Sequence, residues 1–273
     1  MHKRLIVAAM LATAAHSVGA QTVVVTGPGT QFTNAGPSSS SDPACPANGS
    51  WCARNVRNSG AAGITSALPR SGNGSIQMNG PIGQSYKADF EHYFATPNQF
   101  TLSSLQSFGY DWFRSSTSTT SSHFAPSLRL RLSDFSYLVY EPALNGPSKN
   151  SIFAQPTDAW QTNVFGDNGY VWWNSEGTQL AYSIADWKAG RSTANSRFLD
   201  GSAVVIGFST GIGSGWAGSF DGAVDNVTYK TSAMSQATTY NFETTAVVPE
   251  PTTYALFATG LVGVLFMRRR RKS

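Results

Sequence analysis

The chain has 273 residues, of which 41% are hydrophobic, 12% aromatic and only 12% charged. This length suits one globular domain with extensions, and the composition excludes a collagen, a coiled coil and a polytopic membrane protein. The formal net charge is +4, but the chain between the two end segments carries 12 basic and 14 acidic residues. The basic balance comes from the ends, so it does not indicate a nucleic-acid partner.

Residues 1–20 have the three parts of a secretory signal peptide. A basic start is followed by an apolar run from Leu5 to Ala15 and by small residues up to Ala20. This pattern predicts that signal peptidase cuts between Ala20 and Gln21 and that the mature chain is exported. An N-terminal core helix is the alternative, but the apolar run lacks the polar face of such a helix.

Residues 21–70 are predicted to form a loosely ordered lead-in, because they hold one strand-like run, at 22–26, and then mostly turn formers. The only two cysteines of the chain, Cys45 and Cys52, lie in this segment. In an exported protein, a disulfide that closes a small loop is their simplest interpretation. A zinc site is the alternative, but it needs two further ligands nearby, and the mature chain has only two histidines.

Residues 71–245 are predicted to form an all-β domain. Leu128, Leu130 and Leu132 alternate with arginines, which is typical of a half-buried strand. The uniformly apolar run 204–208 is expected in the centre of a sheet, and a short helix is expected over 183–188, with Gly190 as its stop. Strands are predicted at 74–79, 85–94, 100–113, 128–132, 135–141, 159–165, 170–174, 203–208, 218–230 and 239–243. So many strands with so little helix predict a two-sheet β-sandwich of jelly-roll type.

The acidic residues offer one suggestive pair for hydrolysis. Asp89 and Glu91 are two positions apart, so on a strand both side chains share a face at a spacing of about 6.6 Å. However, the Glu-x-Asp-x-x-Glu signature of laminarinase-like sandwich hydrolases does not occur, and neither does a Gly-x-Ser-x-Gly elbow or a phosphate-binding glycine loop. No catalytic residue is therefore assigned, and a solvated strand face explains the pair equally well.

The tryptophans are the candidates for glycan contact, above all Trp172, Trp173 and Trp216. A partly exposed ring beside amides can stack on a sugar face, as in a lectin-like site. Because Trp172 and Trp173 are adjacent, a strand would point them to opposite faces. Core packing is the alternative for each of them.

Calcium is the one cofactor considered. Asp221, Asp225 and Asn226 offer oxygen atoms of the kind that Ca²⁺ prefers, but they form no Asp-x-Asp-x-Asp loop. These residues are also ordinary turn formers, so the sequence predicts no certain cofactor.

Residues 246–273 combine three unlike features in a fixed order. Pro249, Glu250 and Pro251 are followed by an apolar segment, 252–267, and then by Arg268, Arg269, Arg270 and Arg271. At about 1.5 Å per residue, the apolar segment is just long enough for a short single transmembrane helix. The arginine cluster would stay cytoplasmic and stop translocation. A plain C-terminal anchor without processing is the alternative.

This tail resembles the PEP-CTERM sorting signal of Gram-negative bacteria, a segment also called the ice-binding-protein C-terminal domain. The resemblance implies that an exosortase, a membrane cysteine protease, cuts at Pro-Glu-Pro and passes the protein from the inner membrane to the cell surface or the extracellular matrix. The stretch 216–243 also resembles the ending of many secreted PEP-CTERM proteins that have a concanavalin-like or carbohydrate-binding-module-like sandwich. We therefore expect a non-catalytic, surface-sorted protein that binds extracellular polysaccharide or adheres. A secreted polysaccharide hydrolase and a purely structural matrix component are the alternatives.

Overall fold

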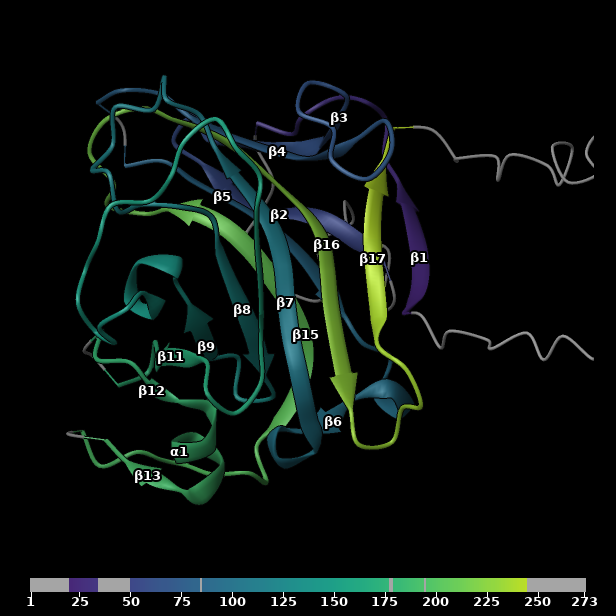
Figure 1. The fold of residues 1–273 in the computed structure, drawn as a ribbon, viewed down its shortest axis with the longest axis vertical. Coiled ribbons are helices and arrows are strands. Elements are labelled where there is room, and N and C mark those ends of the chain that lie inside the picture. The colour runs from purple at the N-terminus through teal and green to yellow at the C-terminus, as the bar shows by residue number, and fades with distance from the viewer. Residues whose placement is uncertain (1–19, 34–49, 84, 177–178, 194, 245–273) are drawn as a thin grey trace, which may run out of the picture.

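The computed structural model describes residues 20–33, 50–83, 85–176, 179–193 and 195–244. In them, two β-sheets pack face to face, with a small two-stranded sheet beside them (Figure 1). This arrangement confirms the predicted β-sandwich of jelly-roll type.

The first sheet is built around the long strand β16 (Phe220–Thr231). Strand β7 pairs along one side of β16, and β10 forms the edge beyond β7. On the other side, β4 pairs with the first part of β16 and β17 with a later part, so both strands share one side of β16. Beyond them, β3 pairs with β4, and β1 pairs with β17 as a parallel edge strand (Figure 1). The other strands of this sheet are β1 (Gln21–Thr26), β3 (Ala61–Thr65), β4 (Ser75–Gly80), β7 (Leu105–Arg114), β10 (Gln161–Phe165) and β17 (Thr238–Glu243).

The second sheet has the strand order β12-β11-β9-β8-β15-β5-β2, and β6 pairs with the start of β15. Strand β15 lies between β8 and β5, so the apolar run at 204–208 is central in its sheet, as predicted. The strands are β2 (Trp51–Arg57), β5 (Lys87–Tyr93), β6 (Phe100–Thr101), β8 (Ser127–Leu132), β9 (Tyr137–Tyr140), β11 (Tyr170–Trp173), β12 (Tyr182–Ser183) and β15 (Val204–Gly213).

The remaining elements are short. The small third sheet joins β13 (Arg191–Ser192) and β14 (Phe198–Leu199). Among the described residues, the helical elements are α1 (Ile184–Ala189) and three 3-10 turns, η1 (Thr96–Asn98), η2 (Leu102–Ser104) and η3 (Pro142–Asn145).

The local signals in the sequence explain the helix α1. Ser183 caps α1, because its side chain accepts a hydrogen bond from the Asp186 N–H while the Asp186 carboxylate accepts from the Ser183 N–H. Gly190 follows the helix with a φ of +99°, a conformation that few residues other than glycine adopt. The predicted helix and its stop are both confirmed.

The core lies between the inward faces of the two sheets. Leu128, Leu130 and Leu132 of β8 are at most 2% exposed and belong to one hydrophobic cluster, so they share the inward face, as their alternation predicted. The prediction that the strand is half-buried was wrong, because Arg129 and Arg131 on its other face are only 7% and 5% exposed. Phe208 of the neighbouring strand β15 belongs to the same cluster, as does Trp112 of β7 in the first sheet.

The prediction of a loosely ordered lead-in was wrong for its described part. Besides β1, which the sequence predicted, residues 50–70 form β2 and β3, each paired into one of the two sheets. Strand β3 is rich in alanine and glycine because the segment that contains Thr30 passes close to it. A Cβ at Gly63 would lie 2.4 Å from the Thr30 carbonyl oxygen. Small residues satisfy this close packing, but they carry no strand signal in a sequence.

The signal peptide, except for Ala20, and the sorting tail from residue 245 onward lie outside the described residues. Within the described residues, no helix is long and apolar enough to cross a membrane. The predicted transmembrane segment, 252–267, is not among them.

Candidate functional site

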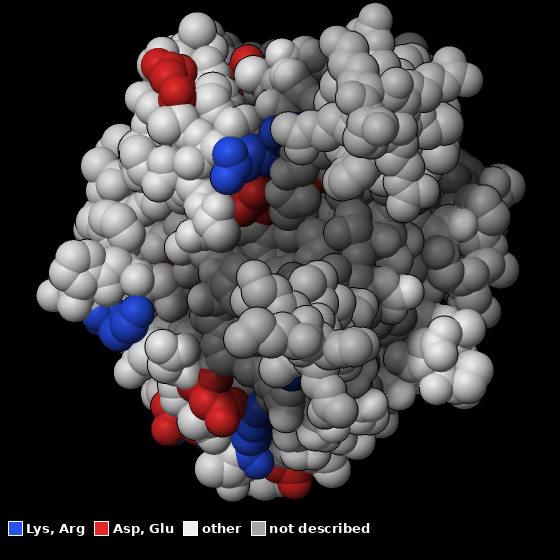
Figure 2. Space-filling model, turned by 45° about the vertical axis from the view of Figure 1, so that its right-hand side comes forward, with Lys and Arg blue, Asp and Glu red and all other residues white. Residues whose placement is uncertain are grey.

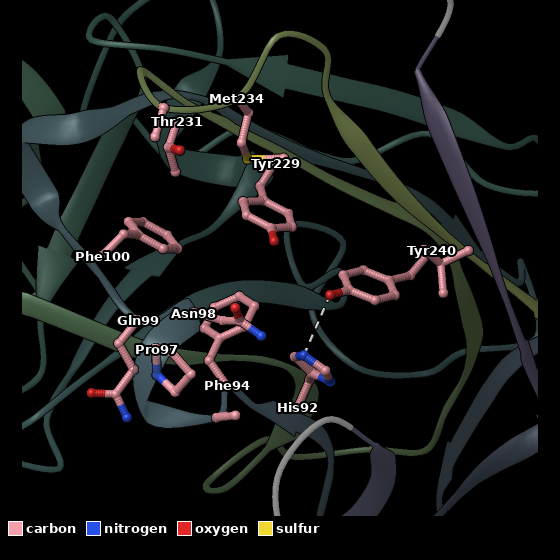
Figure 3. A pocket seen from close by; sticks show the side chains of 13 residues that line it. His92, Phe94, Pro97, Asn98, Gln99, Phe100, Tyr229, Thr231, Met234 and Tyr240 are labelled. Carbon is pink, nitrogen blue, oxygen red and sulfur yellow. Dashed lines mark hydrogen bonds between the residues drawn. The ribbon is translucent and has the colours of Figure 1, made fainter.

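A cavity of about 580 Å³ lies where β5, β6, β16 and β17 come together (Figure 3). Its aromatic walls are His92 and Phe94 from β5 or its end, Phe100 from β6, Tyr229 from β16 and Tyr240 from β17. We call this cavity the aromatic pocket.

Three of these rings form a row. The ring centroids of Phe100 and Tyr229 are 5.9 Å apart with planes 11° from parallel, and those of Tyr229 and Tyr240 are 6.3 Å apart with planes 6° from parallel. Figure 3 shows the row crossing the pocket from Phe100 to Tyr240. Apolar ring surface of this extent, next to polar groups, is typical of small-molecule sites.

Two neighbouring amides supply the polar groups. Asn98 and Gln99 line the pocket directly before β6, at the end of η1. Pro97 stands in the first turn of η1, and the Asn98 N–H donates to the Ala95 carbonyl oxygen, which fixes this short turn. The Asn98 side chain is exposed, so its amide can both donate to and accept from a ligand.

The aromatic pocket carries no formal charge near neutral pH. Its described lining contains no Lys, Arg, Asp or Glu. Burial lowers the pKa of His92 to about 4, so the imidazole is neutral, and its Nε2 lies 3.3 Å from the hydroxyl oxygen of Tyr240. Burial also raises the pKa of Tyr229 and of Tyr240 above the usual value, so both hydroxyls stay protonated.

The tryptophans selected from the sequence do not line this pocket. Trp173 is 2% exposed, donates from its indole N–H to Ser136 Oγ and belongs to the core. Trp172 is half-buried, and its place beside Trp173 on β11 confirms that adjacent rings point to opposite faces. Trp216 is also half-buried and stacks on Phe124, with centroids 4.5 Å apart.

The pocket's own aromatic residues carried weak signals in the sequence. Tyr229 and Tyr240 fall in the closing stretch that resembles secreted sandwich proteins, but nothing in that stretch separates ligand-facing from core tyrosines. Phe100 and the two amides become neighbours of these tyrosines only through the pairing of β6 with β15 and the packing of the two sheets.

Asp89 and Glu91 share the outward face of β5, as predicted, while Phe90 between them belongs to the core. Both acids are 1% exposed. Arg129 lies 2.7 Å and Lys87 2.8 Å from carboxylate oxygens of Asp89. Burial opposes ionisation, but these two cations hold the pKa of Asp89 below its usual value. Since a glycosidase needs one protonated carboxyl group, Asp89 is not a candidate for the general acid.

Glu91 is engaged by tyrosines on the same face. Its two carboxylate oxygens accept hydrogen bonds from the hydroxyls of Tyr93, at 2.7 Å, and Tyr137, at 2.9 Å. Burial raises the pKa of Glu141, which comes directly after β9, although the charge of Arg129 opposes this. Asp89 and Glu141 thus have pKa values shifted in opposite directions.

The acids proposed for calcium are used by the fold. The buried Asp225 carboxylate accepts from the backbone N–H groups of Asn226, Phe242 and Ser71, at 2.7, 3.0 and 3.2 Å. Asp221 accepts from the Asn79 amide at 2.6 Å, and the Asn226 amide donates to Asp111. Among the described residues, no group of three or more His, Cys, Asp or Glu side chains is arranged to hold a metal ion.

Other predicted site residues fall partly or wholly outside the described ranges. Cys52 is buried on β2, but Cys45 is not described, so the disulfide stays a prediction. At the predicted cleavage point, Ala20 is exposed and Gln21 begins β1, where its N–H donates to the Ala237 carbonyl oxygen.

The C-terminal end matches a known family. Residues 247–271 match the PEP-CTERM protein-sorting motif. The motif marks an exported protein of a Gram-negative bacterium that carries a membrane-anchored sorting signal and is processed by an exosortase. No curated protein is significantly similar to the chain. The motif therefore describes the sorting of the protein, and the role of the sandwich has to be inferred from its own residues.

Proposed function

We propose that this exosortase-sorted protein acts at the cell surface or in the extracellular matrix as a non-catalytic glycan-binding or adhesive module, and that the aromatic pocket holds the glycan. The observation that carries the proposal is the row of Phe100, Tyr229 and Tyr240 beside the amides of Asn98 and Gln99. A pyranose ring offers an apolar face to stack on such rings and hydroxyls to bond with such amides.

The test is a polysaccharide pull-down with the full-length chain in a detergent without a sugar headgroup. We expect the wild type to bind, and Asn98→Ala with Gln99→Ala to bind at least several-fold more weakly. The matched control is Gln106→Ala, because Gln106 is an exposed glutamine that does not line the pocket. Equal binding by the amide variant and the control would contradict the proposal.

A polysaccharide hydrolase is the second candidate. The pKa of Asp89 is lowered and that of Glu141 is raised, although the charge of Arg129 acts on both carboxyl groups. Acid–base catalysis uses pairs of carboxyl groups whose pKa values differ in this way. Assaying the pull-down mixtures for new reducing ends separates the two candidates. Release that is lost in Glu141→Gln would favour the hydrolase, whereas binding without release favours the glycan-binding module. If neither occurs, the purely structural matrix role is the remaining proposal.

A further inference from the structure

A second, smaller cavity lies close to the aromatic pocket. It has a volume of about 250 Å³ and is lined by Ser133, Asp134, Trp173, Phe198, Asp200 and Ser202, among others. We call it the Phe198 pocket.

The two pockets have no lining residue in common, but segments beside them are paired by hydrogen bonds. Phe100, which lines the aromatic pocket, pairs with Val205, and Leu102 donates its N–H to Ala203, which lines the Phe198 pocket. Because neighbouring strands lie about 4.8 Å apart, the paired segments around β6 and the start of β15 form a narrow ridge between these parts of the two linings. One extended ligand can reach from one pocket to the other across this ridge.

The Phe198 pocket also combines rings with polar groups. Phe198 is 61% exposed at its rim, so its ring is open to a ligand. The guanidinium of Arg197 lies 4.9 Å from the ring centre of Trp173 and 2.7 Å from Asp134, both of which line the cavity. Polar groups that can bond to hydroxyls therefore stand beside these rings.

The free acceptor in this pocket is Asp200. One of its carboxylate oxygens accepts from the Ser202 N–H at 2.8 Å and from the Ser202 hydroxyl at 2.6 Å. The other oxygen has no hydrogen-bond partner among the described residues. An ionised acceptor suits a ligand rich in hydroxyl donors and repels a ligand that carries carboxylates.

We propose that the Phe198 pocket is a second subsite and that a single neutral polysaccharide chain occupies both pockets. This inference rests on the proposed function. The charge of the visible surface is consistent with a neutral ligand. On the described part of the face in Figure 2, charged side chains are few and form small groups of both signs. Uronic-acid polymers should bind less well than neutral ones, because the described lining of the aromatic pocket holds no cation to pair with them. The lining of the Phe198 pocket holds two carboxylates, and the nearby Arg197 is already paired with one of them.

The test begins with the full-length chain and a panel of neutral polymers, namely xylan, mixed-linkage glucan, mannan and dextran, beside alginate and pectate. The neutral polymer that binds is then hydrolysed to an oligosaccharide ladder, and affinity is measured against chain length. We expect affinity to rise with length until both pockets are filled and to change little with salt, because no ion pair forms.

Phe198→Ala separates the two subsites. It should weaken the binding of long oligosaccharides about tenfold and leave the shortest binding oligosaccharide unchanged. Ile152→Ala is the matched control, since Ile152 is 64% exposed and lines neither pocket. Because both side chains are largely exposed, both variants should fold.

Each contrary result has its own meaning. If Phe198→Ala behaves like Ile152→Ala with long oligosaccharides, the second subsite is wrong while the proposed function stands. Binding to alginate or pectate alone would overturn the neutral class. If the wild type binds no polymer, the proposed function fails, and this inference fails with it.

Discussion

Tyr229 and Tyr240 lie with their rings 6° from parallel and their centroids 6.3 Å apart, although they belong to different strands. In the register of the two strands, Tyr240 pairs with Val227 and Tyr229 with Thr238, so the tyrosines are diagonal neighbours across the β16–β17 hairpin. The hairpin thereby presents two hydroxylated rings to the same cavity, and Phe100 extends the row from the other sheet.

The row predicts that ring surface, rather than the Tyr229 hydroxyl, dominates glycan affinity. Tyr229→Leu should weaken binding about tenfold, and Tyr229→Phe should weaken it by much less, because the stacking face is kept. Isothermal titration with the bound oligosaccharide measures the difference. A larger loss in Tyr229→Phe than in Tyr229→Leu would contradict this prediction, and the melting temperature of both variants checks that they fold.

The fold was predictable where local signals and periodicity agree. The Leu and Arg alternation of β8 and the Ser183, Asp186 and Gly190 signals around α1 act within a few residues, so the sequence alone reveals them. Strands β2 and β3 depend instead on partners far along the chain. The small residues of β3 make sense only once Gly63 is seen packed against the Thr30 backbone.

The candidate site was less predictable for the same reason. Tryptophan is the obvious residue for stacking on sugars, yet Trp173 is needed in the core and Trp216 packs on Phe124. The rings of the aromatic pocket come instead from Phe100, Tyr229 and Tyr240, which only the sheet packing brings together. The sharing of one face by Asp89 and Glu91 was predictable, because it follows from strand geometry alone.

The buried ion pair of Asp89 predicts a large loss of stability on neutralisation. Asp89→Asn leaves Arg129 and Lys87 without their carboxylate partner in a buried place, so the free energy of unfolding should fall by about 3 to 5 kcal/mol. Urea unfolding measures this value. The matched control is Asp134→Asn, whose ion pair with Arg197 is roughly half exposed and should change stability by less than about 1 kcal/mol. Equal losses in both variants would contradict the prediction.

Asp225 predicts a contribution to stability that falls as the pH rises. Burial, aided by the charge of Glu243, raises its pKa from 3.8 to about 6, against the hydrogen bonds from three backbone N–H groups. Between these two values the folded state binds more protons than the unfolded state, so the contribution is complete below pH 3.8 and is lost as the pH rises through 6. The stability difference between wild type and Asp225→Asn should therefore shrink by up to about 3 kcal/mol from pH 4 to pH 7. Parallel stability curves would show that Asp225 does not titrate in this range.

The buried His92 predicts a contribution to the free energy of unfolding that rises with pH, opposite to that of Asp225 and in an overlapping pH range. Burial lowers its pKa from 6.5 to about 4, so the folded state favours the neutral ring. Its contribution is complete above pH 6.5 and is lost as the pH falls through 4, by up to about 3 kcal/mol. Because Asp225 acts in the other direction, the wild-type curve alone hides both effects. Urea unfolding of His92→Gln beside the wild type isolates the histidine, and a difference that does not change with pH would contradict this assignment.

The position of the sorting motif predicts that exosortase processing needs the short segment 244–248. Strand β17 ends at Glu243 and is paired with β1 on one side and β16 on the other, while Pro249 is only six positions further along the chain. A protease groove binds an extended chain. The six residues of β17 cannot enter such a groove unless their hydrogen bonds to both β1 and β16 break. Deleting 244–248 should therefore leave a larger, membrane-held product, as should replacing Pro249, Glu250 and Pro251 by alanines.

Immunoblots of membrane and culture-fluid fractions measure this product. The matched control inserts five Gly and Ser residues after residue 244, which lengthens the connection and should leave processing intact. Normal processing of the deletion variant would mean that β17 detaches from the sheet before cleavage. Urea unfolding would then have to show a lower stability for β17 than for the rest of the sandwich, since a strand held by two ladders on a common core otherwise unfolds with the whole domain.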